Sequence, residues 1–110
     1  MVQLTAAQAE TYLEDRRAKG FNAVLVSLIE HEFADSAPNN RAGDGPFLTP
    51  GDYATPNPSY FAHAANVLDI AESKGMLVLL TPSYMGYGGG SQGWYQEMSA
   101  NGASKLRAYG

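Results

Sequence analysis

The chain carries the same local pattern twice: a helix-like segment, a Lys-Gly pair, an apolar run and a polar loop. The apolar runs are FNAVLVSL (residues 21–28) and MLVLLT (residues 76–81), and the glycines before them, Gly20 and Gly75, recur at an offset of 55 residues. Continuous runs of Val and Leu are typical of strands buried on both faces. Strands that alternate with helices favour a parallel sheet with the helices packed outside it. The pattern therefore predicts an α/β fold.

Helix signals precede both apolar runs. Thr5 and Gln8 have the spacing of a capping box, and the segment 5–19 should place Ala9, Tyr12, Leu13 and Arg16 on one face before Gly20 ends it. Asn57 followed by Pro58 predicts the start of a second helix. The residues that we expect to face inward from that helix are Phe61, Ala64, Ala65, Leu68 and Ala71. Pro82 should close the second strand, and the segment 100–110 should begin a further helix.

The chain is acidic and contains no cysteine. Its formal net charge is −4 and no cluster of Lys or Arg interrupts this balance, so nucleic acid is not an expected partner. Its apolar runs are far shorter than the about 20 residues that span a bilayer. The N-terminus lacks the basic and apolar regions of a signal peptide. We therefore expect a soluble protein with no membrane partner and no cofactor, and the sequence leaves its compartment open.

Both polar loops follow the carboxyl ends of the predicted strands, which is the end that carries the active site in a (β/α)8 barrel. A complete barrel has eight strands in roughly 250 residues. We therefore interpret the chain as a partial (β/α)8 barrel, with two parallel strands and flanking helices. Its open sheet edges are expected to allow self-association. The first loop, residues 30–57, is longer than most connections in compact domains, and functional loops are the usual exception.

The runs YLEDRRAKGFNAVLVSL, NNRAGDGPF and TPNPSYFAHAANVLDIAESKGMLVLLTPSYMG give the chain a specific resemblance. From about Leu4 to Gly110 it resembles the apiosidase-like glycoside hydrolases, a TIM-barrel family that also carries an older collagen-binding label. The resemblance implies that the two strands are the second and third of eight. Residues 1–110 would then be a fragment of one glycosidase-type TIM-barrel domain, without its first strand and strands four to eight. It also implies that the acid/base and the nucleophile lie on later strands, so no catalytic residue is expected in this chain.

Glu30, His31 and Glu32 directly follow the first apolar run. If the strand continued through them, the two carboxylates would point to one side and the imidazole to the other. Carboxylates accept hydroxyl donors, and histidine both donates and accepts, so this cluster suits sugar hydroxyls. A solvated strand end, with an ion pair to Arg41, is the structural alternative. The other histidine, His63, lies within a helix, so no metal site is expected.

The second loop, GYGGGSQGW (residues 86–94), combines glycines with aromatic residues. We expect Tyr84 and Trp94 to stack on the C–H faces of sugars, and the alternative is that Trp94 pins the loop onto the fold. Gly88, Gly90 and Gly93 satisfy G-x-G-x-x-G, but they follow the strand too late and precede no clear helix start. A dinucleotide site is therefore not favoured.

In the first loop, NNRAGDG (residues 39–45) superficially resembles a calcium loop. The EF-hand pattern fails because Ala42 stands where an oxygen ligand belongs. Turn formation explains most of the segment, and Asn40 is the residue that we expect to reach a sugar.

These features favour a segment of a glycoside hydrolase that acts on the glycosidic bonds of a polysaccharide. The chain would contribute loops of the substrate cleft but not the catalytic carboxylates. The alternatives are a non-catalytic carbohydrate- or collagen-binding module, and a truncated product without independent function. The expected carbohydrate-binding residues are Glu30, His31, Glu32, Asn40, Tyr84 and Trp94, and no metal ligand is expected.

Overall fold

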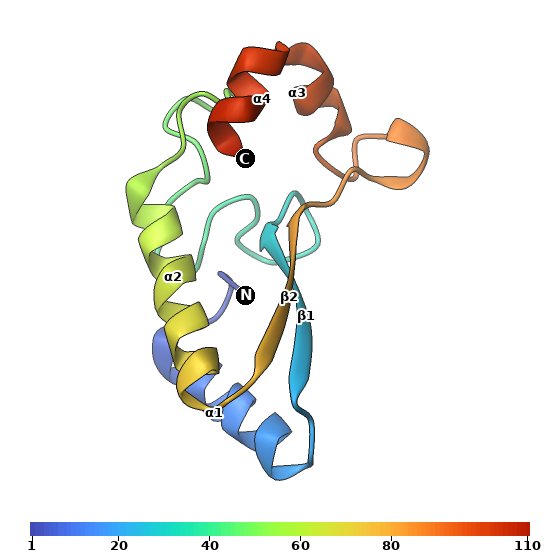
Figure 1. The fold of residues 1–110 in the computed structure, drawn as a ribbon. Helices are drawn as coiled ribbons and strands as arrows, with labels where there is room; N and C mark the ends of the chain where they lie inside the picture. The colour runs from blue at the N-terminus through green and yellow to red at the C-terminus, as the bar shows by residue number, and fades with distance from the viewer.

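The computed structural model describes residues 1–110 without a gap. Two parallel strands, β1 (Ala23–Ile29) and β2 (Leu77–Ser83), form the only sheet. The helices α1 (Ala6–Ala18) and α2 (Pro58–Ser73) precede them, and the 3₁₀ turn η1 (Tyr87–Gly89) and the short helices α3 (Tyr95–Ala100) and α4 (Ala103–Tyr109) follow. Figure 1 shows α1 and α2 beside the strands, with α3, α4 and the loops gathered beyond the carboxyl ends of the strands. The predicted α/β class is confirmed.

Both long helices begin with the predicted caps. The Thr5 hydroxyl accepts a hydrogen bond from the Gln8 amide (3.2 Å), and the Gln8 side chain accepts one from the Thr5 amide (2.9 Å). The side-chain oxygen of Asn57 accepts from the Ser59 amide at 3.1 Å, with Pro58 at the first helical position. These bonds satisfy amides that a helix start otherwise leaves unpaired. None of the helices combines the length and the apolar character that crossing a bilayer requires.

The strand bounds differ from the predicted ones at their ends. Strand β1 starts at Ala23 rather than Phe21, and strand β2 continues through Pro82 to Ser83. The register pairs Ser27 with Thr81 and Ile29 with Ser83, and it leaves Pro82 without a partner. A proline that donates no hydrogen bond is tolerated in this edge strand. The prediction that Pro82 closes the strand is therefore wrong.

Only one face of the sheet is covered. Val24 and Val78 pack against the small cluster of Leu13, Ala71 and Met76 from α1, α2 and the turn before β2. The opposite face carries leucines with large exposed fractions: Leu25 (75%), Leu77 (61%) and Leu79 (53%). The apolar runs do not alternate, yet the strands are not buried on both faces. That part of the prediction is wrong because no element of the chain packs over these leucines, whereas Ile29 at the end of β1 is buried in the main core.

The buried stripe of α2 lies about one residue away from the predicted one. Its buried residues are Tyr60, Ala64, Val67 and Ala71, whereas Ala65 is exposed and Phe61 and Leu68 are half-buried. Tyr60 sets this rotation, because its hydroxyl donates to the Leu28 carbonyl at the end of β1 (3.1 Å). In α1, Ala9 and Leu13 are buried as predicted. Tyr12 is 45% exposed, with the Arg16 guanidinium 4.8 Å from its ring centroid.

The long first loop contributes to the main core. Phe47 (6% exposed) and Tyr53 (0%) join Val2, Ile29, Tyr60, Ala64 and Trp94 in one cluster. An antiparallel bridge between Phe47 and Pro56 folds this part of the loop back on itself, and the Leu48 amide donates to the Thr55 carbonyl at 2.8 Å. The loop is therefore ordered by its own apolar residues, which the polar composition of the segment does not suggest.

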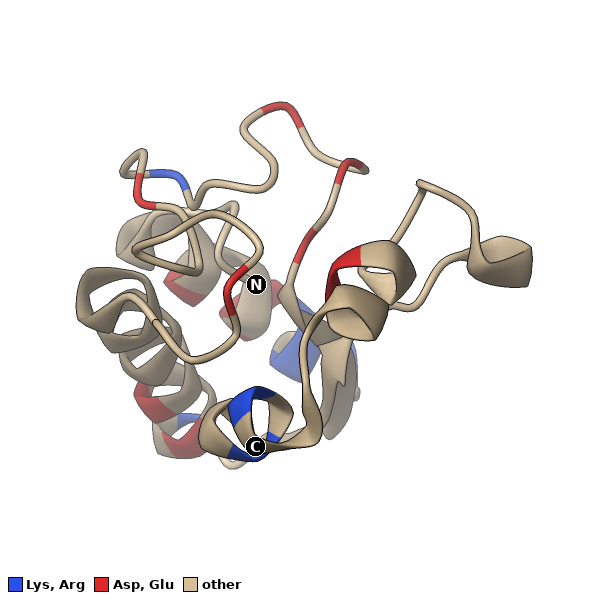
Figure 2. Cartoon of the chain, turned by 90° about the horizontal axis from the view of Figure 1, so that it is seen from above, with Lys and Arg blue, Asp and Glu red and all other residues tan.

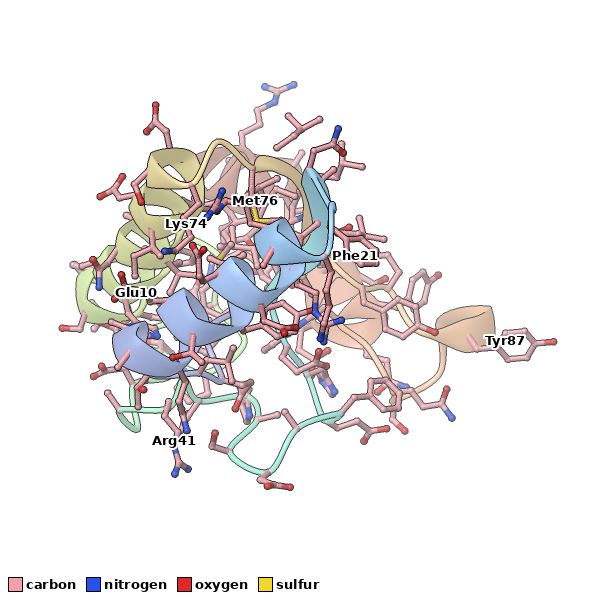
Figure 3. The ribbon with its side chains drawn as sticks, turned by 90° about the horizontal axis from the view of Figure 1, so that it is seen from below. Glu10, Phe21, Arg41, Lys74, Met76 and Tyr87 are labelled. Carbon is pink, nitrogen blue, oxygen red and sulfur yellow. The ribbon has the colours of Figure 1, made fainter.

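Acid should weaken the contact between α1 and α2 at Glu14. Hydrogen bonds from Arg17 and from Lys74 lower the pKa of Glu14 from 4.5 to about 2, and Figure 3 shows Lys74 at the end of α2 beside α1. Because the folded state lowers this pKa, the contribution is complete above pH 4.5 and is lost as the pH falls toward 2. We expect Glu14→Gln to lower the melting temperature at pH 7 by roughly 1–3 °C and to have no such effect at pH 2.

Thermal unfolding followed by circular dichroism between pH 2 and pH 7 measures this difference. Glu72→Gln is the matched control, because Glu72 is exposed on α2 and forms no ion pair. An equal loss of melting temperature for Glu14→Gln at both ends of the pH range would contradict the assignment.

Self-association through the open sheet stays a prediction, and the exposed leucine face gives it a test. Sedimentation velocity at increasing protein concentration should show a shift from monomer to larger species. Leu79→Lys places a charge on the exposed face and should restore the monomer. A monomer at every concentration for the unaltered chain would refute the prediction.

Candidate functional site

The candidate site lies at the carboxyl ends of the two strands. Because β1 and β2 are parallel and Ile29 pairs with Ser83, the loops that follow both strands leave from the same end of the sheet. Figure 1 shows these loops and α3 on that side of the molecule. Ligands of open α/β sheets bind outside the carboxyl ends of the strands, so this is the end where a site is expected.

Glu30, His31 and Glu32 do not continue the strand, which ends at Ile29. The Glu30 carboxylate turns back and accepts from the amides of His31 (2.9 Å) and Phe33 (3.3 Å). Glu32 is exposed. The strand alternation expected for these residues is therefore wrong, because the chain turns immediately after β1. No ion pair joins Arg41 to either carboxylate, and Figure 3 shows Arg41 at the outside of the loop.

His31 makes the most specific contact of the three. Its Nε2 lies 3.0 Å from Oε1 of Glu97, a residue of α3 that is 66 positions away in the sequence. Since a carboxylate only accepts hydrogen bonds, Nε2 donates to Glu97. The imidazole also stands edge-on to the ring of Trp94, with 4.7 Å between ring centroids. Together these contacts fix the orientation of His31 at the end of β1.

Trp94 is largely buried, with 4% of its surface exposed. Its ring meets Phe47 edge-on at 5.8 Å and Tyr53 at 6.4 Å, and its amide donates to the Tyr84 carbonyl at 2.9 Å. This geometry fits the alternative in which Trp94 pins the glycine loop onto the fold. Its indole nitrogen nevertheless has no hydrogen-bond partner, and the residue lines a pocket described below.

Tyr84 and Asn40 differ in their surroundings. Tyr84 is 43% exposed, and its ring lies 6.1 Å from that of Phe33, so the two rings flank the outer rim of the strand ends. Asn40 is fully buried, and its side-chain oxygen accepts from the amides of Ala42 (2.9 Å) and Asp44 (3.0 Å). These bonds give Asn40 a role in shaping its loop, while its contact with a sugar stays a prediction.

A pocket of about 330 Å³ opens between the two loops and α3. Its lining includes His31, Asn39, Phe47, Trp94 and Glu97, together with prolines and glycines of the first loop. A second hollow of about 320 Å³ lies along β1 and α1, but its lining is mostly apolar. The pocket at the strand ends is therefore the candidate site, because it lies where the loops after both strands meet and the His31–Glu97 pair and Trp94 line it.

Several polar atoms without hydrogen-bond partners belong to residues that line this pocket or, for Tyr53, pack against its lining. Five buried side-chain atoms in the structure have no hydrogen bond, and four of them belong to His31 (Nδ1), Glu97 (Oε2), Trp94 (Nε1) and Tyr53 (hydroxyl). An unpaired buried polar atom costs about 1–3 kcal/mol, and native proteins usually satisfy such atoms with ordered water or a ligand. No group of three or more His, Asp or Glu side chains is arranged to hold a metal ion.

The electrostatic surroundings of the site are acidic. The loop 30–57 carries five carboxylates and a single arginine, and Figure 2 shows acidic positions along the loops above the strand ends. Burial raises the pKa of Tyr109 to about 12. Burial also raises the pKa of Tyr53, with smaller contributions from Tyr109 and Glu97, so its phenol stays neutral at physiological pH. The site therefore disfavours anions and offers neutral and acceptor groups.

Sequence reasoning missed Glu97 and the residues that position it. Asn101 follows α3, and its side-chain nitrogen donates to the backbone carbonyls of Gly51 (2.8 Å) and Glu97 (2.6 Å). The Tyr53 amide donates to the Asn101 side chain at 3.2 Å, which ties α3 to the first loop. The spacing of Trp94 and Glu97, three residues apart, fits one side of a helical turn. That local signal does not reveal the distant partner, His31.

The position of Trp94 depends on Gly93. A Cβ atom added at Gly93 would lie 2.2 Å from the amide nitrogen of Gly86 and 2.5 Å from the Tyr84 carbonyl oxygen, so the backbone itself must move. We expect Gly93→Ala to destabilise the fold by about 2–4 kcal/mol and to shift Trp94 fluorescence to longer wavelength. Trp94 is the only tryptophan, so its emission reports on this place alone.

Urea unfolding followed by tryptophan emission tests the effect. Gly102→Ala is the control, because a Cβ there meets nothing within 4 Å, and its cost should stay below about 1 kcal/mol. Equal unfolding midpoints for the two variants would show that the close approach of Gly93 and Gly86 does not support Trp94.

Comparison with known proteins supplies the family. No curated protein matches the sequence. The family model described as "Apiosidase-like, catalytic domain" matches residues 1–110, which is the whole chain. The chain therefore belongs to the apiosidase-like catalytic-domain family, and it is a segment of the glycoside hydrolase type.

Proposed function

We propose that this chain supplies part of the substrate cleft of a glycoside hydrolase that cleaves glycosidic bonds of a polysaccharide. The observation that carries the proposal is the group formed by His31, Trp94 and Glu97 at the carboxyl ends of two parallel strands. Membership of a glycosidase family and a pocket lined by aromatic and polar side chains at that end both support it. We keep Glu30, Glu32, Asn40 and Tyr84 as further candidate contacts around the same cleft.

We propose that the two strands are the second and third of a (β/α)8 barrel. The exposure of Leu25 and Leu79 supports this arrangement, because a barrel interior would bury the face of the sheet on which they lie. In the 110-residue chain, by contrast, β1 and β2 pair only with each other and their outer edges are open. Residues 1–110 then form a fragment of one barrel domain, to which the first strand and strands four to eight would be added.

In this proposal the chain contributes no catalytic carboxylate. Retaining glycosidases use two carboxyl groups about 5 Å apart on either side of the scissile bond. Glu30 is held by the amides of its own turn, and Glu97 is held by His31. Each therefore already has a role in shaping the site, and the acid/base and the nucleophile would come from later strands.

A non-catalytic binding module is the second candidate. The pocket with unpartnered polar groups favours it, because such a pocket can hold a sugar without cleaving it. The two candidates differ in what the barrel around this segment adds, and both require that the chain binds carbohydrate. Binding to collagen rather than to glycans would instead support the module with the collagen-binding label.

The proposal predicts binding without turnover by the 110-residue chain. We expect retention on immobilised plant-type or bacterial polysaccharide, and no release of product from aryl-glycosides or pectic oligosaccharides. Affinity electrophoresis measures the first property, and chromogenic and reducing-sugar assays measure the second. Bovine serum albumin and immobilised collagen serve as the control protein and the control ligand.

Each result has a distinct meaning. Retention without turnover supports a cleft segment that lacks catalytic carboxylates. Turnover that disappears in Glu30→Gln would place a catalytic group in this chain and overturn that part of the proposal. Failure to bind any polysaccharide would overturn the assignment of the strand ends to a carbohydrate cleft.

A further inference from the structure

We infer that Asn101 is a modification site: its side chain deamidates when the joint between α3 and α4 opens, and the product cannot restore the tie between α3 and the first loop. Asn101 and Gly102 form the only Asn-Gly pair in the chain. They occupy the joint between the two short helices, which Figure 1 shows beyond the carboxyl ends of the strands. The inference concerns these two residues and is independent of the ligand that the pocket takes.

The reaction needs only the chain and water. The backbone nitrogen of the glycine attacks the side-chain carbonyl carbon of the asparagine and forms a C–N bond. The bond from that carbon to the side-chain nitrogen breaks, and ammonia leaves with the proton that the backbone nitrogen gives up. Water then opens the resulting succinimide ring at either carbonyl, which yields aspartate or isoaspartate. Glycine favours the attack because it has no side chain to hinder its nitrogen.

The nucleophile of this reaction is free in the structure. Gly102 is exposed, and a Cβ atom added there would meet nothing within 4 Å. Its backbone amide donates no hydrogen bond, because the bonds at the start of α4 use the Gly102 carbonyl instead. Neither a neighbouring side chain nor a hydrogen bond therefore holds this nitrogen back from the attack.

The folded structure protects Asn101 in two other ways. Its side-chain nitrogen donates to the carbonyls of Gly51 (2.8 Å) and Glu97 (2.6 Å), and its side-chain oxygen accepts from the Tyr53 amide (3.2 Å). Its backbone is extended, with φ −93° and ψ 136°. Closing the ring requires the Gly102 nitrogen to rotate about the Cα–C bond until it eclipses Cβ, and this ψ holds it far from that position. Deamidation must therefore wait for a local opening of the joint.

The product cannot make the same contacts. Gly51 and Glu97 both line the pocket at the strand ends, so the side-chain nitrogen of Asn101 joins two of its walls. A carboxylate only accepts hydrogen bonds and would face two carbonyl oxygens that have lost their donor. Isoaspartate also lengthens the main chain by one carbon between α3 and α4. The reaction should therefore release α3, whose first turn follows Trp94.

The first test compares deamidation rates. The chain is incubated at mildly alkaline pH, once folded and once in guanidinium chloride, and peptide mapping by mass spectrometry follows the conversion of Asn101. We expect the folded chain to react at least tenfold more slowly. Gly102→Ala adds a side chain in open space, and it should slow the reaction of the unfolded chain at least tenfold without changing the fold.

The Tyr53 amide reports the opening in the unaltered chain. Because this amide donates to the side chain of Asn101, its hydrogen exchange measures how often the tie breaks. We expect the protection of the Tyr53 amide against exchange and the protection of Asn101 against deamidation to agree within about tenfold. This comparison requires no substitution, so a variant that fails to fold does not affect it.

The second test concerns the consequence of the reaction. Asn101→Asp reproduces one product and should shift Trp94 emission to longer wavelength. Modified wild-type chain, separated by ion exchange and returned to native buffer, should show the same shift. Asn66→Asp is the matched control, because Asn66 is exposed on α2 and lies far from the joint in the sequence, and its emission should not change.

Each contrary result overturns a defined part of the inference. Equal rates in the folded and unfolded chains would show that the structure does not protect Asn101. Strong protection of Asn101 while the Tyr53 amide exchanges freely would show that the tie does not control the reaction. Trp94 emission that stays unchanged in both the modified chain and Asn101→Asp would show that the product retains the tie.

Discussion

Trp94 sits where four separate parts of the chain meet, and the arrangement of the strand ends depends on its burial. It contacts Phe47 and Tyr53 from the first loop edge-on, and it shares their cluster with Ile29 at the end of β1 and with Tyr60 from α2. Burying one such side chain contributes about 1.5–3 kcal/mol, and aromatic pairs add to this. The two loops are therefore held together by apolar packing against each other.

This packing explains why the site and the core cannot be separated. His31 meets Trp94 on one side and Glu97 on the other, so the outer edge of the aromatic cluster is also the wall of the pocket. Polar atoms left unpaired at such an edge weaken stability, and natural proteins retain them chiefly where a ligand or ordered water satisfies them. The close backbone approach of Gly93 to Gly86 serves the same arrangement, because it lets the glycine loop carry Trp94 inward.

The sheet itself has two unlike faces. Val24 and Val78 are packed by the helices, while Leu25 and Leu79 remain exposed on the other side. The candidate site lies at the carboxyl end of this sheet, which is the end that carries the active site in (β/α)8 barrels. A structure that completes its helix side and leaves the other side open is what two neighbouring units of the proposed barrel would show.

The sequence by itself determined the local elements, because caps, glycine stops and apolar runs act within a few residues. Thr5 with Gln8, Asn57 with Pro58, and the two Val- and Leu-rich runs were sufficient for the helices, the parallel strands and the loops at their carboxyl ends. The residues at the end of β1 could also be singled out from the sequence. Only the tertiary structure decided which of them work together, since Glu97 reaches His31 across 66 positions and Phe47 becomes core inside a polar loop. Contacts of that kind depend on how distant segments of the chain pack, and local sequence patterns do not predict that packing.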